Sequence, residues 1–108
     1  MFDDWKEKIK DNPEVSRHLL WEYDFDRIDW EEMKYTVVQR VIERGWMNDF
    51  YAIFRLYGGI AGVREIIKDL PEFQNPKDLS FVCNVFNLKK EDLLCYTRKR
   101  LREIHINS

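Results

Sequence analysis

The sequence is poor in residues that interrupt helices. It has four glycines and three prolines among 108 residues, and its β-branched residues are scattered among Glu, Lys, Arg and Leu. Closely spaced strands need frequent turn residues, whereas Glu, Lys, Arg and Leu favour helices. The composition therefore predicts an all-α fold.

Cysteine and histidine are equally scarce. Cys83 and Cys95 stand twelve residues apart without a C-x-x-C motif, and His18 and His105 lie near opposite ends of the chain. Zinc sites usually need paired, closely spaced ligands. We therefore expect no metal ion and no cofactor, and we interpret both cysteines as reduced thiols that are at least half-buried.

The sequence also lacks a long apolar run. No stretch approaches the ~18 apolar residues of a membrane span, and the acidic start does not resemble a secretory leader. We expect a cytoplasmic protein without membrane contact. Because two independent cores would need roughly 100 residues each, we expect a single helical domain over residues 1–108.

Apolar, aromatic and charged residues, by contrast, are plentiful. The apolar fraction is 44% and the aromatic fraction 15%, which suits a packed core. Residues 1–54 carry 8 Lys and Arg against 13 Asp and Glu, whereas residues 55–108 carry 10 against 7. The basic C-terminal half either meets an acidic partner or simply exposes charged helix faces to solvent.

The clearest predicted helix covers residues 30–44. Asp29 is a good N-cap, with Glu32 three residues later in the capping-box position. An apolar stripe of helical period follows, and Gly45 stands where many helices end in a left-handed residue. Val37 and Val41 in this stripe are predicted to be buried. The whole stripe consists of Trp30, Met33, Val37, Val38, Val41 and Ile42.

Together with this helix, the other periodic segments predict a compact bundle of about six or seven short helices. Asn48 is the expected cap of a helix at 48–57, in which Phe54 should be buried and which Gly58 and Gly59 should end. The remaining predicted helices cover residues 3–10, 13–21, 60–70, 78–86 and 89–104, and residues 22–28 are predicted to form a loop.

Candidate catalytic groups form no recognisable arrangement. Five carboxylates between residues 24 and 32 are better explained as the acidic entrance of a capped helix than as an acid–base pair. No histidine lies near them, neither cysteine has a nucleophile motif, and the glycines around residue 58 lack the strand and the Lys-Ser/Thr of a phosphate loop. We therefore expect no enzymatic activity. These carboxylates belong to Asp24, Asp26, Asp29, Glu31 and Glu32.

The last two predicted helices, 78–86 and 89–104, have the spacing of a helix-turn-helix unit. Cys83 is small enough for close helix packing, Asn87 tolerates a positive φ at the turn, and Leu88 supplies an apolar residue after it. The second helix of such a unit would be the one that contacts DNA.

Basic residues on one side of this second helix could contact nucleic-acid phosphates. However, a recognition helix normally presents its N-terminal residues, and here Glu91 and Asp92 would be repelled by phosphates. Acidic residues at the start and basic residues at the end also suit the helix dipole alone, so both explanations stay open. The candidate nucleic-acid-binding residues are Arg98, Lys99 and Arg102.

A pattern of motifs runs through residues 19–64. A tryptophan precedes an Asp-started helix with V-x-x-R-V-x-E-R-G, and a further aspartate and a Y-G pair follow. This pattern resembles a small bacterial family of domains of unknown function, mostly from Bacteroidetes. The sequence departs from it at Trp46 and Met47, where the family usually has an acidic residue. The matching residues are Trp21, Asp29, Val38, Val41, Glu43, Arg44, Gly45, Asp49, Tyr57 and Gly58.

This resemblance implies a partner. Similar proteins are commonly encoded beside nucleotidyltransferase-type toxins of abortive-infection systems, which implies an antitoxin or accessory role. The motif residues Arg40, Glu43 and Arg44 lie on the polar side of the 30–44 helix, where they could form ion pairs. We therefore expect a non-enzymatic, antitoxin-like protein that binds another protein. The alternative is a helix-turn-helix regulator that binds DNA, and the two functions are compatible.

Overall fold

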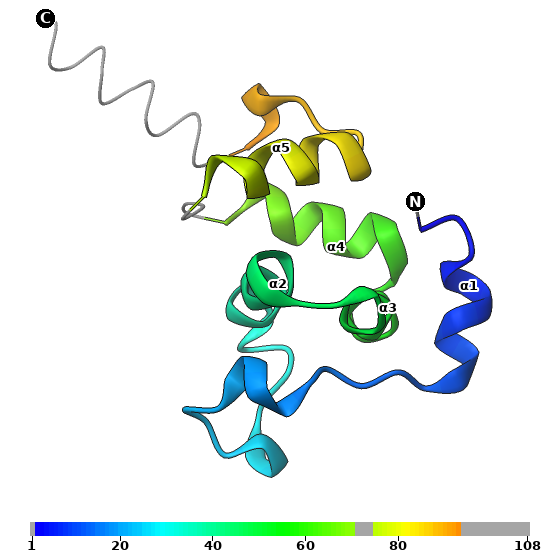
Figure 1. Cartoon of the computed structure of the whole chain (residues 1–108), viewed down its shortest axis with the longest axis vertical. Helices are drawn as coiled ribbons and strands as arrows, with labels where there is room; N and C mark the ends of the chain where they lie inside the picture. Colours follow the sequence, from blue (N-terminus) through cyan, green and yellow to red (C-terminus); the bar gives the residue numbers. More distant parts are fainter. Residues whose placement is uncertain (1, 71–74, 94–108) are drawn as a thin grey trace, which may run out of the picture.

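The computed structural model describes residues 2–70 and 75–93, and all the regular structure in these residues is helical (Figure 1). The all-α prediction is therefore confirmed. Five α-helices occur in these two ranges, fewer than the six or seven predicted. They are α1 (Trp5–Lys8), α2 (Lys34–Arg44), α3 (Met47–Leu56), α4 (Gly59–Lys68) and α5 (Pro76–Val85).

Four short 3₁₀ turns complete the described secondary structure. They are η1 (Ile9–Asp11), η2 (Arg17–Leu20), η3 (Phe25–Arg27) and η4 (Lys90–Asp92). In Figure 1, α4 lies across α2 and α3, whereas α5 and the segment with η2 and η3 lie at opposite ends of the view. None of the helices within these residues has the length and apolar character needed to cross a membrane.

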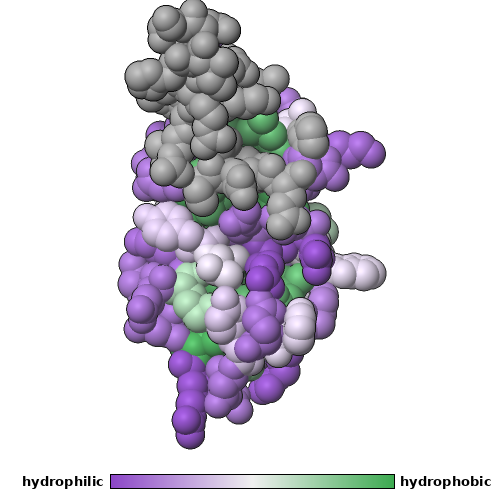
Figure 2. Space-filling model, turned by 90° about the vertical axis from the view of Figure 1, so that its left-hand side faces the viewer, coloured by the Kyte–Doolittle hydropathy of each residue, from purple (hydrophilic) through white to green (hydrophobic). Residues whose placement is uncertain are grey.

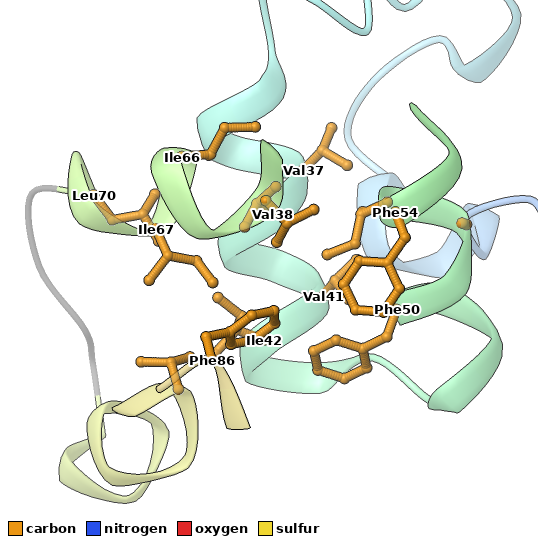
Figure 3. Close-up of a cluster of buried hydrophobic side chains, with 14 of the residues drawn as sticks. Val37, Val38, Val41, Ile42, Phe50, Phe54, Ile66, Ile67, Leu70 and Phe86 are labelled. Carbon is orange, nitrogen blue, oxygen red and sulfur yellow. The ribbon is translucent and has the colours of Figure 1, made fainter. Parts of the chain in front are cut away.

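The core lies where α2, α3 and α4 meet. In α2 the buried residues follow the helical period, so one face of the helix is apolar. Figure 3 shows these side chains pointing toward α3 and α4, with Phe86 after α5 joining them. The predicted burial of Val37, Val41 and Phe54 is confirmed, since each is at most 1% exposed. The labelled cluster comprises Val37, Val38, Val41, Ile42, Phe50, Phe54, Ile66, Ile67, Leu70 and Phe86.

Aromatic rings connect the first described residue to this core. Phe2 is 2% exposed and its ring stacks on Phe50 with a centroid separation of 5.0 Å. It also meets Phe54 edge-on at 5.2 Å and lies 6.4 Å from Phe86. Such ring pairs add to the stabilisation from area burial. The N-terminal segment is thus part of the core.

The start of α2 differs in detail from its prediction. The Asp29 carboxylate accepts a hydrogen bond from the Glu32 backbone N–H at 3.1 Å, as expected for a cap. The residues directly after Asp29 form a hydrogen-bonded turn, however, and the α-helix itself begins at Lys34. Tyr57, the residue directly after α3, holds this turn, because its hydroxyl donates to the Trp30 carbonyl at 2.7 Å. Burial raises the pKa of Tyr57 well above its usual range.

The prediction of a left-handed Gly45 at the end of α2 is wrong. Gly45 is extended, with φ −77° and ψ 161°. It is nonetheless a position where a side chain does not fit, because an added Cβ would lie 2.5 Å from the Val41 carbonyl oxygen. The extended backbone takes the chain directly from α2 into α3, which begins two residues later.

Asn48 does not cap α3, contrary to prediction. The helix begins one residue earlier, and its first turn is held by Asp49, whose Oδ2 accepts from the Trp46 backbone N–H at 2.9 Å. The Asn48 side chain instead donates to the Glu14 carbonyl at 3.4 Å. The cap of α3 is therefore an aspartate in the third helical position.

The glycines between α3 and α4 have distinct roles. Gly58 and Gly59 have φ values of +84° and +79°, a conformation that favours glycine. They lie at the predicted break between the two helices, but Gly59 is already the first residue of α4. Gly62 lies inside α4, where an added Cβ would lie 1.6 Å from the Tyr57 carbonyl oxygen. The close approach of the Tyr57 carbonyl thus explains why position 62 is glycine, although glycine lowers the stability of a helix.

The predicted helix at 13–21 is mostly absent. Only η2 is helical there, and Ser16 before it is extended at φ −64° and ψ 132°. The carbonyl of Pro13 accepts from Arg55 Nε at 2.9 Å, so α3 provides a hydrogen bond that the segment would otherwise make within itself. Tertiary contacts to α3 therefore outweigh the local helical pattern.

The predicted helix-turn-helix is not confirmed, although one helix and one turn residue of it lie at the end of the described chain. Helix α5 begins at Pro76, after Asn75, whose side chain accepts from the Lys77 N–H at 2.9 Å. Asn87 has the expected positive φ of 54°. After it, Asp92 Oδ2 accepts from the Lys89 N–H at 3.1 Å in the turn η4. Most of the predicted 89–104 helix lies outside the described residues.

Candidate functional site

Two tryptophans stand out on a largely hydrophilic surface. Figure 2 shows one face of the molecule, on which hydrophilic residues predominate and small pale and apolar areas lie among them. Trp5 and Trp30 pack against the core, but Trp21 is 76% exposed and Trp46 is 73% exposed. Tryptophan has the largest aromatic side chain, so this exposure leaves much apolar area in water.

Trp21 forms one wall of a surface hollow of about 280 Å³, which we call the Trp21 hollow. Trp21 and its neighbour Glu22 follow η2, and the other side chains come from the polar side of α2 near its C-terminal end. The complete lining is Trp21, Glu22, Arg40, Glu43 and Arg44. The α2 residues are spaced three and four apart, which places them on one side of the helix.

Arg40 is the central cation of this hollow. Its Nη2 pairs with the Glu22 carboxylate, and its Nη1 donates to the Leu19 carbonyl at 3.0 Å. The two charged side chains are only 30% and 29% exposed. Arg40 therefore holds the segment around Trp21 against α2. The prediction that residues on this side of the helix form ion pairs is confirmed for Arg40, which pairs with Glu22.

The charges of the hollow act on one another. The hydrogen bond from Arg40 is the main cause that lowers the pKa of Glu22, and Arg44 contributes through its charge. The same hydrogen bond is the main cause that raises the pKa of Arg40, and Glu43 contributes to that rise. Both partners of the ion pair are thus held in their charged forms.

Glu43 has a carboxylate oxygen without a partner among the described residues. Its Oε1 is buried from solvent and accepts no hydrogen bond there. Arg40, three residues earlier on the same side of α2, is already bound to Glu22 and the Leu19 carbonyl. A buried acceptor without a donor is costly, so Glu43 Oε1 lowers the stability of this side of α2.

Sequence analysis had pointed to other residues. The candidate nucleic-acid contacts Arg98, Lys99 and Arg102 lie outside the described residues. The five carboxylates between residues 24 and 32 do not converge on one pocket; Asp24 and Asp26 form exposed ion pairs with Arg27 and Arg17. Among residues 2–70 and 75–93, no group of three or more His, Cys, Asp or Glu is placed to hold a metal ion.

Sequence analysis did not identify the exposure of Trp21 and Trp46. Trp21 is the last residue of the predicted helix at 13–21 and a matching residue of the motif pattern, whereas Trp46 follows the predicted helix at 30–44 and departs from the pattern. A usable signal is present for Trp46, which lies between Gly45 and the helix at 48–57, outside both apolar stripes. Trp21 gives no such signal, because it continues the apolar pair Leu19 and Leu20.

The residues that line the hollow lie within a segment that matches a known protein family. Residues 15–67 match the model of a family described as a family of unknown function (DUF6922). This range contains Trp21, Trp46 and all five residues that line the Trp21 hollow. No curated protein and no solved structure matches the chain. The segment from just before η2 to the last turn of α4 is therefore similar to a family of unknown function, DUF6922.

Proposed function

We propose that this protein is a non-enzymatic, antitoxin-like component that binds another protein through a surface containing Trp21 and the Trp21 hollow. The observation that carries the proposal is the exposure of two tryptophans, Trp21 and Trp46, at 76% and 73%. By contrast, the phenylalanine side chains of α3, Phe50 and Phe54, are buried in the core. The chain thus buries large rings in its core, yet Trp21 and Trp46 are the most exposed of the described aromatic side chains.

Tryptophan and arginine are the side chains most often responsible for binding energy at protein interfaces. Truncation of such a residue commonly weakens binding by 2 kcal/mol or more, about 30-fold. Trp21 stands next to Arg40, which is already fixed by Glu22 and the Leu19 carbonyl. A fixed arginine beside an exposed ring loses little freedom on binding, which favours affinity.

The nature of the partner rests on the resemblance described above. Proteins with a similar motif pattern are commonly encoded beside nucleotidyltransferase-type toxins. We therefore propose such a toxin as the protein partner. An antitoxin of this kind acts by occupying its partner, so it needs a binding surface and no catalytic group of its own.

Affinity capture from the native host tests the proposal. The unmodified protein, Trp21→Ala, Trp46→Ala and the control Tyr35→Ala are each used as bait, and captured proteins are identified by mass spectrometry. Tyr35 is exposed on α2 but does not line the hollow. We expect a nucleotidyltransferase-type protein with the unmodified bait and with Tyr35→Ala, and at least a tenfold loss with Trp21→Ala. Equal capture by all four baits would contradict the proposed surface.

A second candidate function is DNA binding by the C-terminal part of the chain. The observation that favours it is the left-handed Asn87 at φ 54°, between α5 and η4, with Leu88 and Leu93 buried after it. A left-handed residue after α5 is compatible with the short turn of a helix-turn-helix. The basic residues of that proposal, Arg98, Lys99 and Arg102, are those predicted from sequence.

Salt dependence distinguishes the two functions. Phosphate contacts release counterions, so DNA affinity falls steeply as salt rises. If DNA is bound, the triple variant R98A/K99A/R102A should weaken binding to all duplexes and flatten the salt slope. If the protein partner alone is bound, the unmodified chain should show no duplex binding at ~0.15 M salt, and the triple variant should still capture the partner.

A further inference from the structure

We infer that the N-terminal segment of this protein exchanges between two copies of the chain. The segment covers residues 2–11, with α1 and η1, and we call it the arm. In the exchanged dimer each arm occupies the arm site of the other copy, and Asn12 is the hinge. The arm site consists of the residues that the two aromatic rings of the arm contact, which are Phe50, Tyr51, Phe54, Gly59 and Phe86.

Two aromatic side chains anchor the arm in this site. Phe2 is 2% exposed, and its ring stacks on Phe50 with a centroid separation of 5.0 Å. The Trp5 ring meets Phe54 edge-on at 6.2 Å. It also approaches Gly59 so closely that an added Cβ there would lie 2.4 Å from the ring. Glycine at position 59 thus makes room for Trp5, and the arm site fits this arm specifically.

The arm contacts parts of the chain that are remote in sequence. Helix α1 contacts α3 and α4, and η1 contacts α3. The Tyr51 hydroxyl donates to Asp4 Oδ1 at 2.7 Å, and the Phe2 and Phe86 rings lie 6.4 Å apart. In Figure 1, α1 lies beside α3 at the edge of the molecule, and an extended stretch joins it to η2. A second copy offers the same site, so exchange replaces each contact with an identical one.

The extended stretch after the arm is held in place by α3. The Pro13 carbonyl accepts from Arg55 Nε at 2.9 Å, and the Ser16 N–H donates to Asp49 Oδ1 at 2.8 Å. Pro13 itself is buried. None of these contacts involves the arm, so they persist when the arm leaves its own site. The change of direction therefore falls on the residue between them, Asn12.

Asn12 has a backbone conformation that its position in the sequence does not favour. Its φ of 52° and ψ of 54° lie in the left-handed region, which is unfavourable for residues other than glycine, although asparagine tolerates it. The next residue is Pro13, and a residue before proline prefers an extended conformation. Both preferences favour an extended Asn12. Extension at this single residue would direct the arm away from its own arm site.

The exchanged dimer balances this strain against the entropy of association. Each dimer releases the strain of two hinge residues, whereas joining two chains costs translational and rotational freedom. The tethered arm competes with an effective concentration on the order of millimolar, as for a short linker. We therefore expect the unmodified protein to be monomeric at about 10 µM and to form dimers toward about 1 mM.

Substitution of the hinge should shift this balance in both directions. Asn12→Ala makes the left-handed conformation less favourable, so the dissociation constant of the dimer should fall about tenfold. Asn12→Gly adopts that conformation without strain, so the constant should rise about tenfold. The matched control is Asn87→Ala, because Asn87 is also exposed and left-handed, at φ 54°, but lies outside the arm and its connection. Sedimentation equilibrium of the full chain measures all four proteins.

Nuclear magnetic resonance identifies which dimer forms. In an equal mixture of ¹³C-labelled and unlabelled Asn12→Ala chains, isotope-filtered Overhauser spectra detect only contacts between copies. We expect contacts between the Phe2 ring of one copy and the Phe50 ring of the other. Trp21→Ala should leave the dimer unchanged, because no residue of the Trp21 hollow belongs to the arm or the arm site. The inference is thus independent of the proposed protein-binding function.

The inference is overturned if neither the unmodified chain nor Asn12→Ala forms a dimer at about 1 mM, or if Asn87→Ala promotes the dimer equally. A dimer without Phe2–Phe50 contacts between copies, or one lost in Trp21→Ala, would show association through another surface and reject exchange. If Asn12→Ala does not fold, the comparison of Asn12→Gly with the unmodified chain decides, since equal dissociation constants would reject Asn12 as the hinge. Partner capture that depends on Trp21 stands or falls separately from these results.

Discussion

The carboxylate of Asp49 and the backbone of Ser16 join two parts of the chain that lie 33 residues apart. Asp49 Oδ1 accepts from the Ser16 N–H at 2.8 Å and from the Ser16 hydroxyl at 2.7 Å, and its Oδ2 accepts from the Trp46 N–H. Asp49 is completely buried. One carboxylate thus starts α3 and fixes the extended segment before η2 against it.

Asp49→Ala should therefore be strongly destabilising. The substitution removes the acceptor of the Ser16 and Trp46 N–H groups and of the Ser16 hydroxyl. Hydrogen bonds to a charged group contribute about 1.5–3 kcal/mol each. We expect a loss of roughly 3–5 kcal/mol in the free energy of unfolding, measured by urea denaturation. The matched control is Asp26→Ala, whose exposed carboxylate pairs with Arg17; it should change stability by less than about 0.5 kcal/mol.

Phe54→Ala tests the centre of the core. Phe54 is 1% exposed and its ring meets Phe2, Trp5 and Phe86, so its removal leaves a cavity. We expect a cost of roughly 3–5 kcal/mol. Thermal unfolding followed by circular dichroism measures it. An unchanged melting temperature would show that the ring does not occupy the core.

Gly62→Ala should reverse the usual preference of a helix. In an open helix this change gains about 1 kcal/mol, but here the new Cβ would lie 1.6 Å from the Tyr57 carbonyl oxygen. We expect a net loss of about 1–3 kcal/mol, typical of overpacking. Ala61→Gly, one residue earlier at an exposed position, should cost only about 1 kcal/mol. Stabilisation by Gly62→Ala would show that α4 is further from α3 than described.

The Glu22–Arg40 ion pair predicts part of the acid response. Because Arg40 lowers the pKa of Glu22, the pair stabilises the folded state above the pKa that Glu22 has when unfolded. This contribution is lost as the pH falls through the lowered pKa. The melting temperature of Glu22→Gln should therefore be below that of the unmodified protein at neutral pH, and the difference should shrink as the pH falls through and below the range in which free glutamate titrates.

A control separates this pair from the effect of net charge. Glu7→Gln removes the charge of an exposed glutamate whose partner is Lys10, and solvent screens that pair. A pH dependence equal to that of Glu22→Gln would show that Arg40 has no specific effect. Titration of the Glu22 carboxyl by nuclear magnetic resonance gives the direct comparison: Arg40→Met should raise its pKa.

The middle of the fold could be predicted because its signal is local. Helices α2, α3, α4 and α5 lie within a few residues of the predictions, and each has apolar residues at helical spacing with Gly or Pro at an end. The predicted helix at 13–21 was wrong for the opposite reason. Its acceptors and donors are satisfied by Asp49 and Arg55, which are distant in sequence.

The candidate site could be predicted only in part. The polar side of α2 follows from the helical period, so Arg40, Glu43 and Arg44 were expected to lie together. Their neighbour Trp21 was not, because its place depends on how the segment after η2 returns to α2. The hydrogen bond from Arg40 to the Leu19 carbonyl fixes that return, and no sequence periodicity encodes it.

The burial of Phe2 has a consequence for the order of folding. Its ring lies between Phe50 of α3 and Phe86 after α5, so the place it occupies is complete only when almost the whole described chain is present. During synthesis the N-terminal segment leaves the ribosome first, yet its final contact involves one of the last elements described. Closing so long a loop is entropically costly and slow. We therefore expect docking of Phe2 to be a late folding event, after α2, α3 and α4 have assembled.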